Sequence, residues 1–236
     1  MQQSTIKRQI ILDTETTGMN QSGGAVYLGH RIIEIGAVEV INRKLTGRTF
    51  HQYINPQQLI DPEAITVHGI TDERVANEPV FAQIAKEFLA FIDGAEFIAH
   101  NAPFDVSFLD HELSLLGHNT KIADMCQITD SLDIAKSKFP GQKNNLDALC
   151  KRMGIDNSHR TLHGALLDAE ILADVYLLMT GGQIAMNWSG HDKGMGASTI
   201  IRLDSNRPMT KVIRASADET KAHEERLKLV DNPIWQ

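Results

Sequence analysis

The chain has 236 residues, of which 42% are hydrophobic and 22% are charged. This length supports one ordinary core with a small extension, but not two full-sized domains. Apolar residues come in short separate runs, which excludes a disordered chain, a collagen and a membrane-spanning helix. Residues 1–7 lack the features of an export signal, and Cys126 and Cys150 are too few for a disulfide framework or a zinc site. We expect a cytoplasmic protein with two half-buried thiols.

The net charge of -7 is unevenly distributed along the chain. Residues 1–181 contain 15 Lys and Arg against 23 Asp and Glu, whereas residues 182–236 contain 8 against 7. An acidic body lacks the broad basic face with which a protein binds nucleic acid unaided. A nucleic-acid substrate would therefore need local contacts, helped by metal ions or by a partner.

Hydrophobic periodicity predicts three strands first, then a helix, a short strand and three more helices. The strands are expected at residues 8–12, 31–41, 46–54 and 96–99, and the helices at 80–92, 103–116, 145–153 and about 163–179. Antiparallel strands that lead into an alternation of strand and helix indicate an α/β fold, with a mixed β-sheet flanked by helices.

Gly181 and Gly182 end the last strongly apolar helix, so we expect a boundary there. The prediction is a main domain over residues 1–181, a flexible linker over 182–198 and a C-terminal segment over 199–236. Within the last segment, residues 210–213 could form a strand and residues 218–229 a charged helix with a narrow apolar stripe. That composition is typical of a segment that becomes ordered on a partner.

Two carboxylates, Asp13 and Glu15, follow the first apolar run. Residues two apart in a strand project from the same face, so both carboxylates point one way at a sheet edge or terminus. They repel each other unless a cation lies between them, and hard oxygen ligands suit Mg²⁺ or Mn²⁺. The alternative is a solvated turn formed by the following Thr-Thr-Gly.

Three further polar residues could complete such a site. Asp105 lies in the first turn of an expected helix, although the helix dipole alone could explain a carboxylate there. His163 precedes Asp168 by five residues, which is about 140° around a continuous helix, so the two side chains converge only if His163 lies before the helix. Gly164 makes that plausible. A place on the helix surface is the alternative for Asp168.

The segments Asp13-x-Glu15-Thr-Thr-Gly, His100-Asn-Ala-x-Phe-Asp105 and His163-x4-Asp168 resemble, in order and spacing, the three motifs of DEDDh-type 3'-5' exonucleases. Within that family the chain is similar to the proofreading subunits of bacterial replicative DNA polymerases. The resemblance covers nearly the whole chain and weakens after residue 190. It implies a ribonuclease H-like fold and hydrolysis of the terminal phosphodiester at a DNA 3' end, single-stranded or frayed.

Together with the resemblance, the chemistry of these residues assigns each a role. Two Mg²⁺ or Mn²⁺ ions would be held by four carboxylates, those of Asp13, Glu15, Asp105 and Asp168. His163 would be the general base, the role that histidine most often takes in catalysis. The resemblance also implies that Glu63 and His68 approach the terminal nucleotide, together with Asp13, Glu15 and Asp168. His68 is expected on a turn-like loop, where a purely structural role is the alternative.

The other histidines compete with His163 for the role of base. We expect His100 to support the loop around Asp105. Surface positions are expected for His159, His191 and His223, because their surroundings are polar.

The tail carries a short motif. Gln183-Ile-Ala-Met186-Asn-Trp188 resembles the peptide by which replication proteins bind the sliding clamp, with Met186 and Trp188 as apolar anchors. Alternatively, Trp188 covers the domain's own core. The resemblance implies that residues 199–236 bind the polymerase subunit, and it leaves open a small accessory subunit on the catalytic domain.

Two rival functions remain at this stage. An RNA-trimming exonuclease of the same superfamily would use the same five site residues but would not need residues 183–236. A non-catalytic replication scaffold would not need to retain all five groups.

Overall fold

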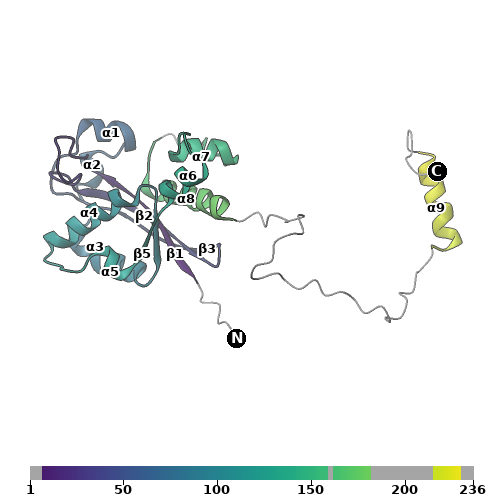
Figure 1. Ribbon diagram of the computed structural model, residues 1–236, viewed down its shortest axis with the longest axis horizontal. Coiled ribbons are helices and arrows are strands. Elements are labelled where there is room, and N and C mark those ends of the chain that lie inside the picture. The colour runs from purple at the N-terminus through teal and green to yellow at the C-terminus, as the bar shows by residue number, and fades with distance from the viewer. Residues whose placement is uncertain (1–6, 159–161, 182–214, 230–236) are drawn as a thin grey trace, which may run out of the picture. The chain divides into compact units, whose positions relative to one another are not determined.

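The computed structural model describes residues 7–158, 162–181 and 215–229 (Figure 1). The chain divides into two units, residues 1–185 and 186–236, and each is described by itself. In the described part of the chain, no helix is long and apolar enough to cross a membrane.

The first unit is built on one five-stranded sheet in the order β3-β2-β1-β4-β5. Its strands are β1 (Arg8–Thr16), β2 (Ile32–Ile41), β3 (Lys44–Tyr53), β4 (Glu96–Ala99) and β5 (Gln127–Asp130). The pairs β1–β2 and β2–β3 are antiparallel, whereas β1–β4 and β4–β5 are parallel. The predicted mixed sheet is confirmed, and β1 lies at its centre.

The helices of this unit are α1 (Pro62–His68), α2 (Asp72–Val75), α3 (Phe81–Ile92), α4 (Ala102–Leu115), α5 (Ile122–Met125), α6 (Ser131–Lys138), α7 (Leu146–Met153) and α8 (Ala165–Thr180). Helices α3, α4, α7 and α8 lie where the periodicity predicts them. Helices α1, α2, α5 and α6 and strand β5 are not predicted, because segments of four to eight residues often show no clear period; of the elements this short, only β4 and α7 are found, β4 by its apolar residues and α7 by its apolar residues and cap.

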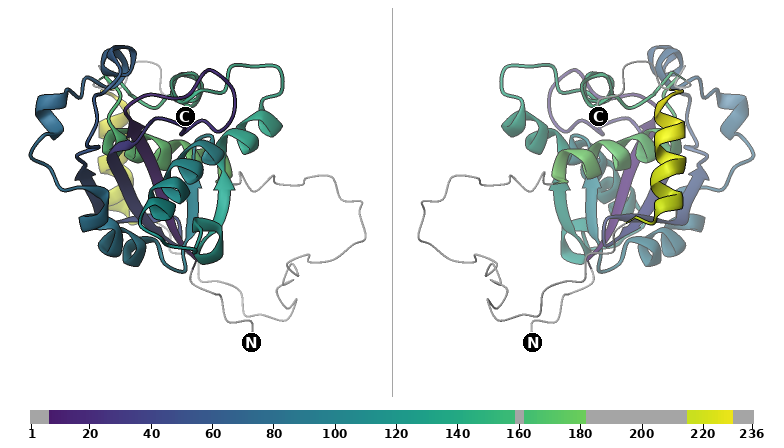
Figure 2. Two further views of the ribbon diagram at one scale, coloured as in Figure 1. Left: turned by 90° about the vertical axis from the view of Figure 1, so that its left-hand side faces the viewer. Right: turned by 90° about the vertical axis from the view of Figure 1, so that its right-hand side faces the viewer.

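Alternation along β1 divides the core between the two faces of the sheet. Ile10 and Leu12 pack in one buried cluster with residues of α3 and α4, and Ile11 packs in another with Leu172 of α8. The two views of Figure 2 show α8 against the sheet, on the face opposite α3 and α4. Since successive side chains alternate, Asp13 and Glu15 continue the α8 face and Thr14 the α4 face.

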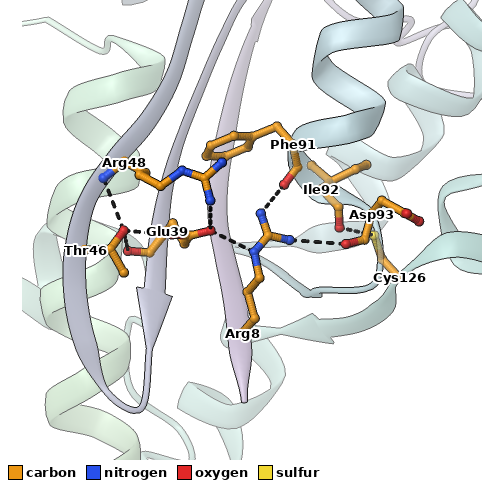
Figure 3. A network of polar contacts seen from close by, with 8 residues as sticks. All are labelled: Arg8, Glu39, Thr46, Arg48, Phe91, Ile92, Asp93 and Cys126. Carbon is orange, nitrogen blue, oxygen red and sulfur yellow. Dashed lines mark hydrogen bonds and ion pairs between the residues drawn. The ribbon is translucent and has the colours of Figure 1, made fainter. Parts of the chain in front are cut away.

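The end of the sheet where β1 begins is closed by a polar network around Glu39 (Figure 3). The Glu39 side chain is 1% exposed and accepts hydrogen bonds from Arg8 at 2.7 Å, Arg48 at 2.9 Å and the Thr46 hydroxyl at 2.9 Å. Arg8 also donates to the carbonyls of Phe91 and Asp93. This network joins β1, β2 and β3 to the end of α3.

The prediction of half-buried thiols is wrong, because both Cys126 and Cys150 are buried. The Cys126 thiol donates to the carbonyl of Ile92 at 3.2 Å. Cys150 packs between α7 and α8 in an apolar cluster with Leu149 and Val175. A small thiol behaves as an apolar side chain, so full burial costs little.

In the second unit, the described residues form α9 (Ala217–Leu227). Ser216 caps it by accepting a hydrogen bond from the Glu219 amide, and the Glu219 carboxylate accepts one from the Ser216 amide in return. The helix buries none of its own side chains, as its charged sequence predicts. The possible strand at 210–213 lies outside the described residues.

Candidate active site

The site begins at the C-terminal end of β1. This strand runs on to Thr16, past the Leu12 end that we predict, because Asp13, Thr14 and Glu15 all continue its ladder with β2. Asp13 lies opposite Gly36, and Glu15 lies opposite Glu34. Both carboxylates therefore stand on the α8 face at the end of the central strand, and not at an edge of the sheet.

Helix α4 brings Asp105 to the same end of the sheet. Strand β4 runs parallel to β1, so the helix that follows it starts beside the end of β1. Asp105 is 3% exposed and accepts a hydrogen bond from the Thr14 hydroxyl at 2.7 Å. Burial raises the pKa of Asp105 to about 7, although the Thr14 hydrogen bond lowers it. A nearby cation would favour its charged form.

Helix α8 and the segment just before it supply the last two residues. His163 lies before the helix, whose N-cap is Gly164, so the condition for convergence of His163 and Asp168 is met. The His163 Nδ1 atom lies 3.2 Å from an Asp168 carboxylate oxygen. The His163 amide donates to the carbonyl of Val67 at 3.2 Å, which ties this segment to the end of α1. Asp168 is 3% exposed and His163 is exposed, so the pair extends from the protein interior to the solvent.

Gly69 permits the close contact between the His163 segment and the end of α1. Gly69 ends α1 with a φ of +72°, in the left-handed region. A Cβ atom there would lie 2.5 Å from a methyl group of Leu162, the neighbour of His163. The His163 segment is therefore packed directly on the glycine that ends α1.

The structure brings Glu15, His163 and Asp168 together, with one possible ligand atom from each within 4.8 Å of the others. Asp13 and Asp105 lie outside that set of three. Asp13 is two residues before Glu15 on the same face, and Asp105 is joined to the intervening Thr14. Carboxylate oxygens are the ligands that hard divalent cations prefer, so the carboxylates gathered here fit a divalent metal ion.

A pocket of about 240 Å³ opens beside these carboxylates. Its walls come from the end of β1, the turn after it, α1 and α4, and are formed by Glu15, Thr16, Gly18, Met19, Gln21, Asp61, Glu63, Ala64, Val67, His68 and Phe104. Of the five residues expected to approach the nucleotide, Glu15, Glu63 and His68 line this pocket, whereas Asp13 and Asp168 do not.

His68 contradicts the expected loop position, since it is the last residue of α1 and is 6% exposed. Pro62 starts this short helix and Gly69 ends it, and no period is visible over seven residues. Burial lowers the pKa of His68, so its ring is neutral at physiological pH. Its Nδ1 atom accepts a hydrogen bond from the Ile70 amide at 3.0 Å, which leaves the proton on Nε2. That Nε2 atom has no hydrogen-bond partner among the described residues.

The structure gives His100 the supporting position that we expect. Its two ring nitrogens lie 2.9 Å from the Ser131 hydroxyl and 2.8 Å from the Asn144 carbonyl, so the ring ties β4 to α6 and to the segment before α7. His223 is exposed on α9, as predicted. His159, His191 and the three residues expected to bind the clamp also lie outside the described residues; those three are Gln183, Met186 and Trp188.

Sequence reasoning missed three residues that hold the site together. Thr14 binds Asp105, Glu34 accepts a hydrogen bond from the first amide of α8, and Gly36 lies under the first turn of that helix. Glu34 did carry a signal, because a charged residue inside an otherwise apolar strand needs a buried partner. The other two give no sign in the sequence.

Comparison with known proteins identifies the family. A family model described as "Exonuclease" matches residues 10–176. The DNA polymerase III epsilon subunits of Salmonella typhimurium and Escherichia coli are 55% and 54% identical over 231 residues, which is 96% of this chain and 95% of each relative. The epsilon subunit of Haemophilus influenzae is 54% identical over 97% of this chain and 94% of its own.

Solved structures agree with this assignment. Exonuclease X in complex with 5' overhanging duplex DNA matches 77% of this chain and 94% of its own, with a TM-score of 0.54 and 26% identity. The nuclease domain of 3'hExo, a DEDDh family member bound to rAMP, shares the fold, with a TM-score of 0.57 and 20% identity over 75% of this chain and 92% of its own. The chain therefore belongs to the exonuclease family and, within it, to the epsilon subunits of DNA polymerase III.

Proposed function

We propose that this proofreading exonuclease hydrolyses the terminal phosphodiester of a frayed DNA 3' end with two divalent ions, Mg²⁺ or Mn²⁺, and releases nucleoside 5'-monophosphates. The ions would be held by Asp13, Glu15, Asp105 and Asp168. The observation that carries the proposal is the convergence of Glu15, His163 and Asp168 within 4.8 Å, beside a pocket of about 240 Å³. When bound, two such ions lower the pKa of an attacking water and stabilise the leaving 3' oxygen.

His163 is the general base in this mechanism. Its side chain is 45% exposed, so solvent water can reach the ring. Asp168, at 3.2 Å, orients the ring and stabilises the positive charge that develops when the ring takes the proton from water. The backbone contact to Val67 holds the histidine in place before α8 begins.

The pocket beside Glu15 would receive the terminal nucleotide. His68 is part of the pocket wall, where its ring would pack against the terminal nucleotide. Glu63, on the first turn of α1, would accept from a sugar hydroxyl. A mispaired terminus enters such a pocket at little cost, whereas a paired one must first be unstacked at a few kcal/mol. Single-strandedness, and not the identity of the base, would then select the substrate.

The decisive experiment is release of deoxynucleoside monophosphates from a primer with a mismatched 3' end. We expect release with Mg²⁺ or Mn²⁺, none with EDTA, and slower release from a matched primer. An RNA oligonucleotide of the same sequence serves as the second substrate. Preferential digestion of RNA would support the RNA-trimming alternative, and no release from any substrate would support the scaffold.

The C-terminal residues would provide assembly. Residues 199–236, which include α9, would bind the polymerase III alpha subunit, and Gln183, Met186 and Trp188 would bind the sliding clamp from the linker 182–198. The catalytic domain, residues 1–181, could also carry a small accessory subunit, and the complex would be cytoplasmic. Support comes from the relatives, whose names place them in DNA polymerase III and whose similarity extends over 96% of this chain. The exposed polar surface of α9 is suited to docking on a partner.

Two changes to the chain separate assembly from chemistry. Alanine at Gln183, Met186 and Trp188 together should weaken binding to the purified clamp, without affecting the alpha subunit or hydrolysis of a short single strand. A fragment that ends at Gly182 should still digest single strands but lose both partners. If this fragment bound the alpha subunit as tightly as the full chain, or failed to fold by circular dichroism, the division at residue 182 would be wrong.

A further inference from the structure

Glu34 is a buried carboxylate that faces the proposed site. It lies in β2, directly opposite Glu15 in the antiparallel ladder, and is 2% exposed. Like charges directly opposite each other on one face of a sheet are destabilising. The fold therefore has to hold the Glu34 carboxylate by specific contacts.

Those contacts use both of its oxygens. One Glu34 oxygen lies 2.7 Å from His51 Nε2, on the neighbouring strand β3. The other accepts a hydrogen bond from the amide of Ala165 at 3.0 Å. Ala165 is the first residue of α8, so Glu34 is the point at which the sheet binds the start of that helix.

Helix α8 needs this contact because its own N-cap cannot provide it. The N-cap residue is Gly164, and no side chain caps the helix from that position. The first amides of any helix lack partners within the helix, and the positive end of its dipole attracts a carboxylate. Glu34 thus serves as a cap for α8 that comes from a strand 131 positions away in the sequence.

The first turn of α8 also rests directly on the sheet. A Cβ atom at Gly36 would lie 2.1 Å from the Leu166 nitrogen and 2.2 Å from the Ala165 carbonyl carbon. Gly36 and Glu34 are two apart on the same face of β2. Gly36 sets the distance between the start of α8 and the sheet, and Glu34 sets the position of that helix start along the sheet.

We propose that Glu34, oriented by His51, is a positioning residue for the reaction: it fixes the first turn of α8 and so places His163 and Asp168 against Glu15. His163 lies two residues before Ala165, and Asp168 lies three residues after it. An error of about 1 Å in such a constellation can cost on the order of 10²-fold in rate. The inference rests on the site roles proposed above, because only then does the place of these two side chains control hydrolysis.

The test compares Glu34→Leu with Glu34→Gln and with a matched control, Glu39→Leu. Glu39 is a second buried glutamate of the same strand, but its partners lie at the opposite end of the sheet (Figure 3). Leucine removes all the hydrogen bonds at either position. Glutamine at position 34 keeps an acceptor for the Ala165 amide. Each full-length variant is assayed for kcat and KM on a mismatched primer, for its melting temperature, and for hydrogen exchange of the Ala165 amide without added metal.

We expect Glu34→Leu to lower kcat by about 10- to 100-fold, the range for outer residues that orient a site, with KM changed much less. Exchange of the Ala165 amide should accelerate, and Glu34→Gln should restore most of both properties. Glu39→Leu should lower the melting temperature but leave kcat and Ala165 exchange unchanged. His51→Ala, which removes one of the contacts that orient the carboxylate and keeps the hydrogen bond to Ala165, should give a smaller loss of the same kind and replaces Glu34→Leu if that variant does not fold.

Three results would overturn the inference. The first is a wild-type kcat together with wild-type protection of the Ala165 amide in Glu34→Leu, or in His51→Ala if Glu34→Leu does not fold. The second is a failure of Glu34→Gln to restore kcat and protection. The third is an equal loss of kcat in Glu39→Leu, which would show that kcat follows overall stability. His163→Ala separates this inference from the proposed function. If His163→Ala is as active as the wild type, the site assignment itself fails. If His163→Ala is inactive while Glu34→Leu keeps its rate and protection, only the positioning role of Glu34 fails.

Discussion

The two ends of strand β2 each hold a buried glutamate, and the two are stabilised in different ways. Glu39 is surrounded by Arg8, Arg48 and Thr46, so arginine charge neutralises it. Glu34 is held by a histidine and a backbone amide, opposite another carboxylate. Both are 1–2% exposed, so burial alone does not distinguish them.

The difference shows what each end of the sheet does. At the Glu39 end, permanent cations and backbone carbonyls form a closed network that joins three strands to α3 (Figure 3). At the Glu34 end, carboxylates from four separate segments, β1, β2, α4 and α8, gather around a hydroxyl, an imidazole and a helix start. Carboxylates held close together in this way repel each other and so favour binding of cations. The first arrangement stabilises the fold, and the second is the one to which we assign the chemistry.

Removal of the proposed base should produce the largest change. We expect His163→Ala to slow hydrolysis by about 10²- to 10⁴-fold, because general-base catalysis contributes that much. Its melting temperature should stay close to the wild-type value, since the side chain is 45% exposed. Manganese binding, followed by calorimetry, should be largely kept in His163→Ala and impaired in Asp13→Ala. Wild-type turnover by His163→Ala at neutral pH would falsify the assignment of His163.

A methyl group between β2 and α8 should have the next largest effect. Gly36→Ala places a Cβ atom 2.1 Å from the α8 backbone, so the helix start must move. We expect a loss of about 1–3 kcal/mol of stability from overpacking. The shift should also lower kcat by up to about 10²-fold, because it displaces the site residues on α8.

Gly94→Ala is the control for Gly36→Ala at the far end of the sheet. Gly94 has a φ of +67°, and a methyl group added there would meet no described atom within 4 Å, so alanine strains the backbone without moving α8. It should reduce the melting temperature but keep kcat. Equal losses of kcat in both variants would show that the rate follows stability and not the position of α8.

Glu39→Gln should change stability and not activity. Loss of hydrogen bonds to charged groups should cost about 1.5–3 kcal/mol in urea unfolding at neutral pH. Burial opposes ionisation of Glu39, but the hydrogen bonds from Arg8 and Thr46 and the Arg48 charge outweigh it and lower its pKa below the ordinary value of 4.5. Because the pKa of Glu39 is lower in the folded state than in the unfolded state, its ionisation stabilises the fold at pH values above 4.5. This contribution is lost as the pH falls through the folded-state pKa. The gap between wild type and Glu39→Gln should therefore narrow below pH 4.5; a gap that widened there would contradict this account.

The smallest effect is expected at Cys126, beside the Glu39 network (Figure 3). Burial raises the pKa of this thiol to about 11, so it stays protonated at neutral pH. Thiols react as thiolates, so a disulfide reagent should label Cys126 only after unfolding, and Cys126→Ala should keep full activity. Rapid labelling of the native protein, located by peptide mapping, would show that this end of the sheet opens.

Much of the site could be predicted from the sequence. The spacing of Asp13 and Glu15 placed both on one face of a strand, and Gly164 made a position of His163 before its helix plausible. These features depend on neighbours within about five residues, so local periodicity and capping preferences decide them. The mixed sheet followed in the same way from the order of apolar runs.

Contacts between distant segments could not be predicted. Nothing near Thr14 shows that its hydroxyl binds Asp105, 91 positions later. Helix α1 was missed, so His68 was expected on a loop, because seven residues between a proline and a glycine show no period. The buried thiols were missed for a related reason, since burial depends on which elements cover a residue.

The sequence by itself determined which chemical groups the protein has and on which local element most of them lie: carboxylates on a strand and at helix starts, and a histidine before a glycine. Only the tertiary structure decided how these groups meet. Pairing of β1 with β2 sets Glu15 against Glu34, and Gly36 lets α8 approach until the Ala165 amide reaches that carboxylate. The physical reason is that local preferences act over a few residues, whereas strand register and helix packing depend on the burial of the whole core.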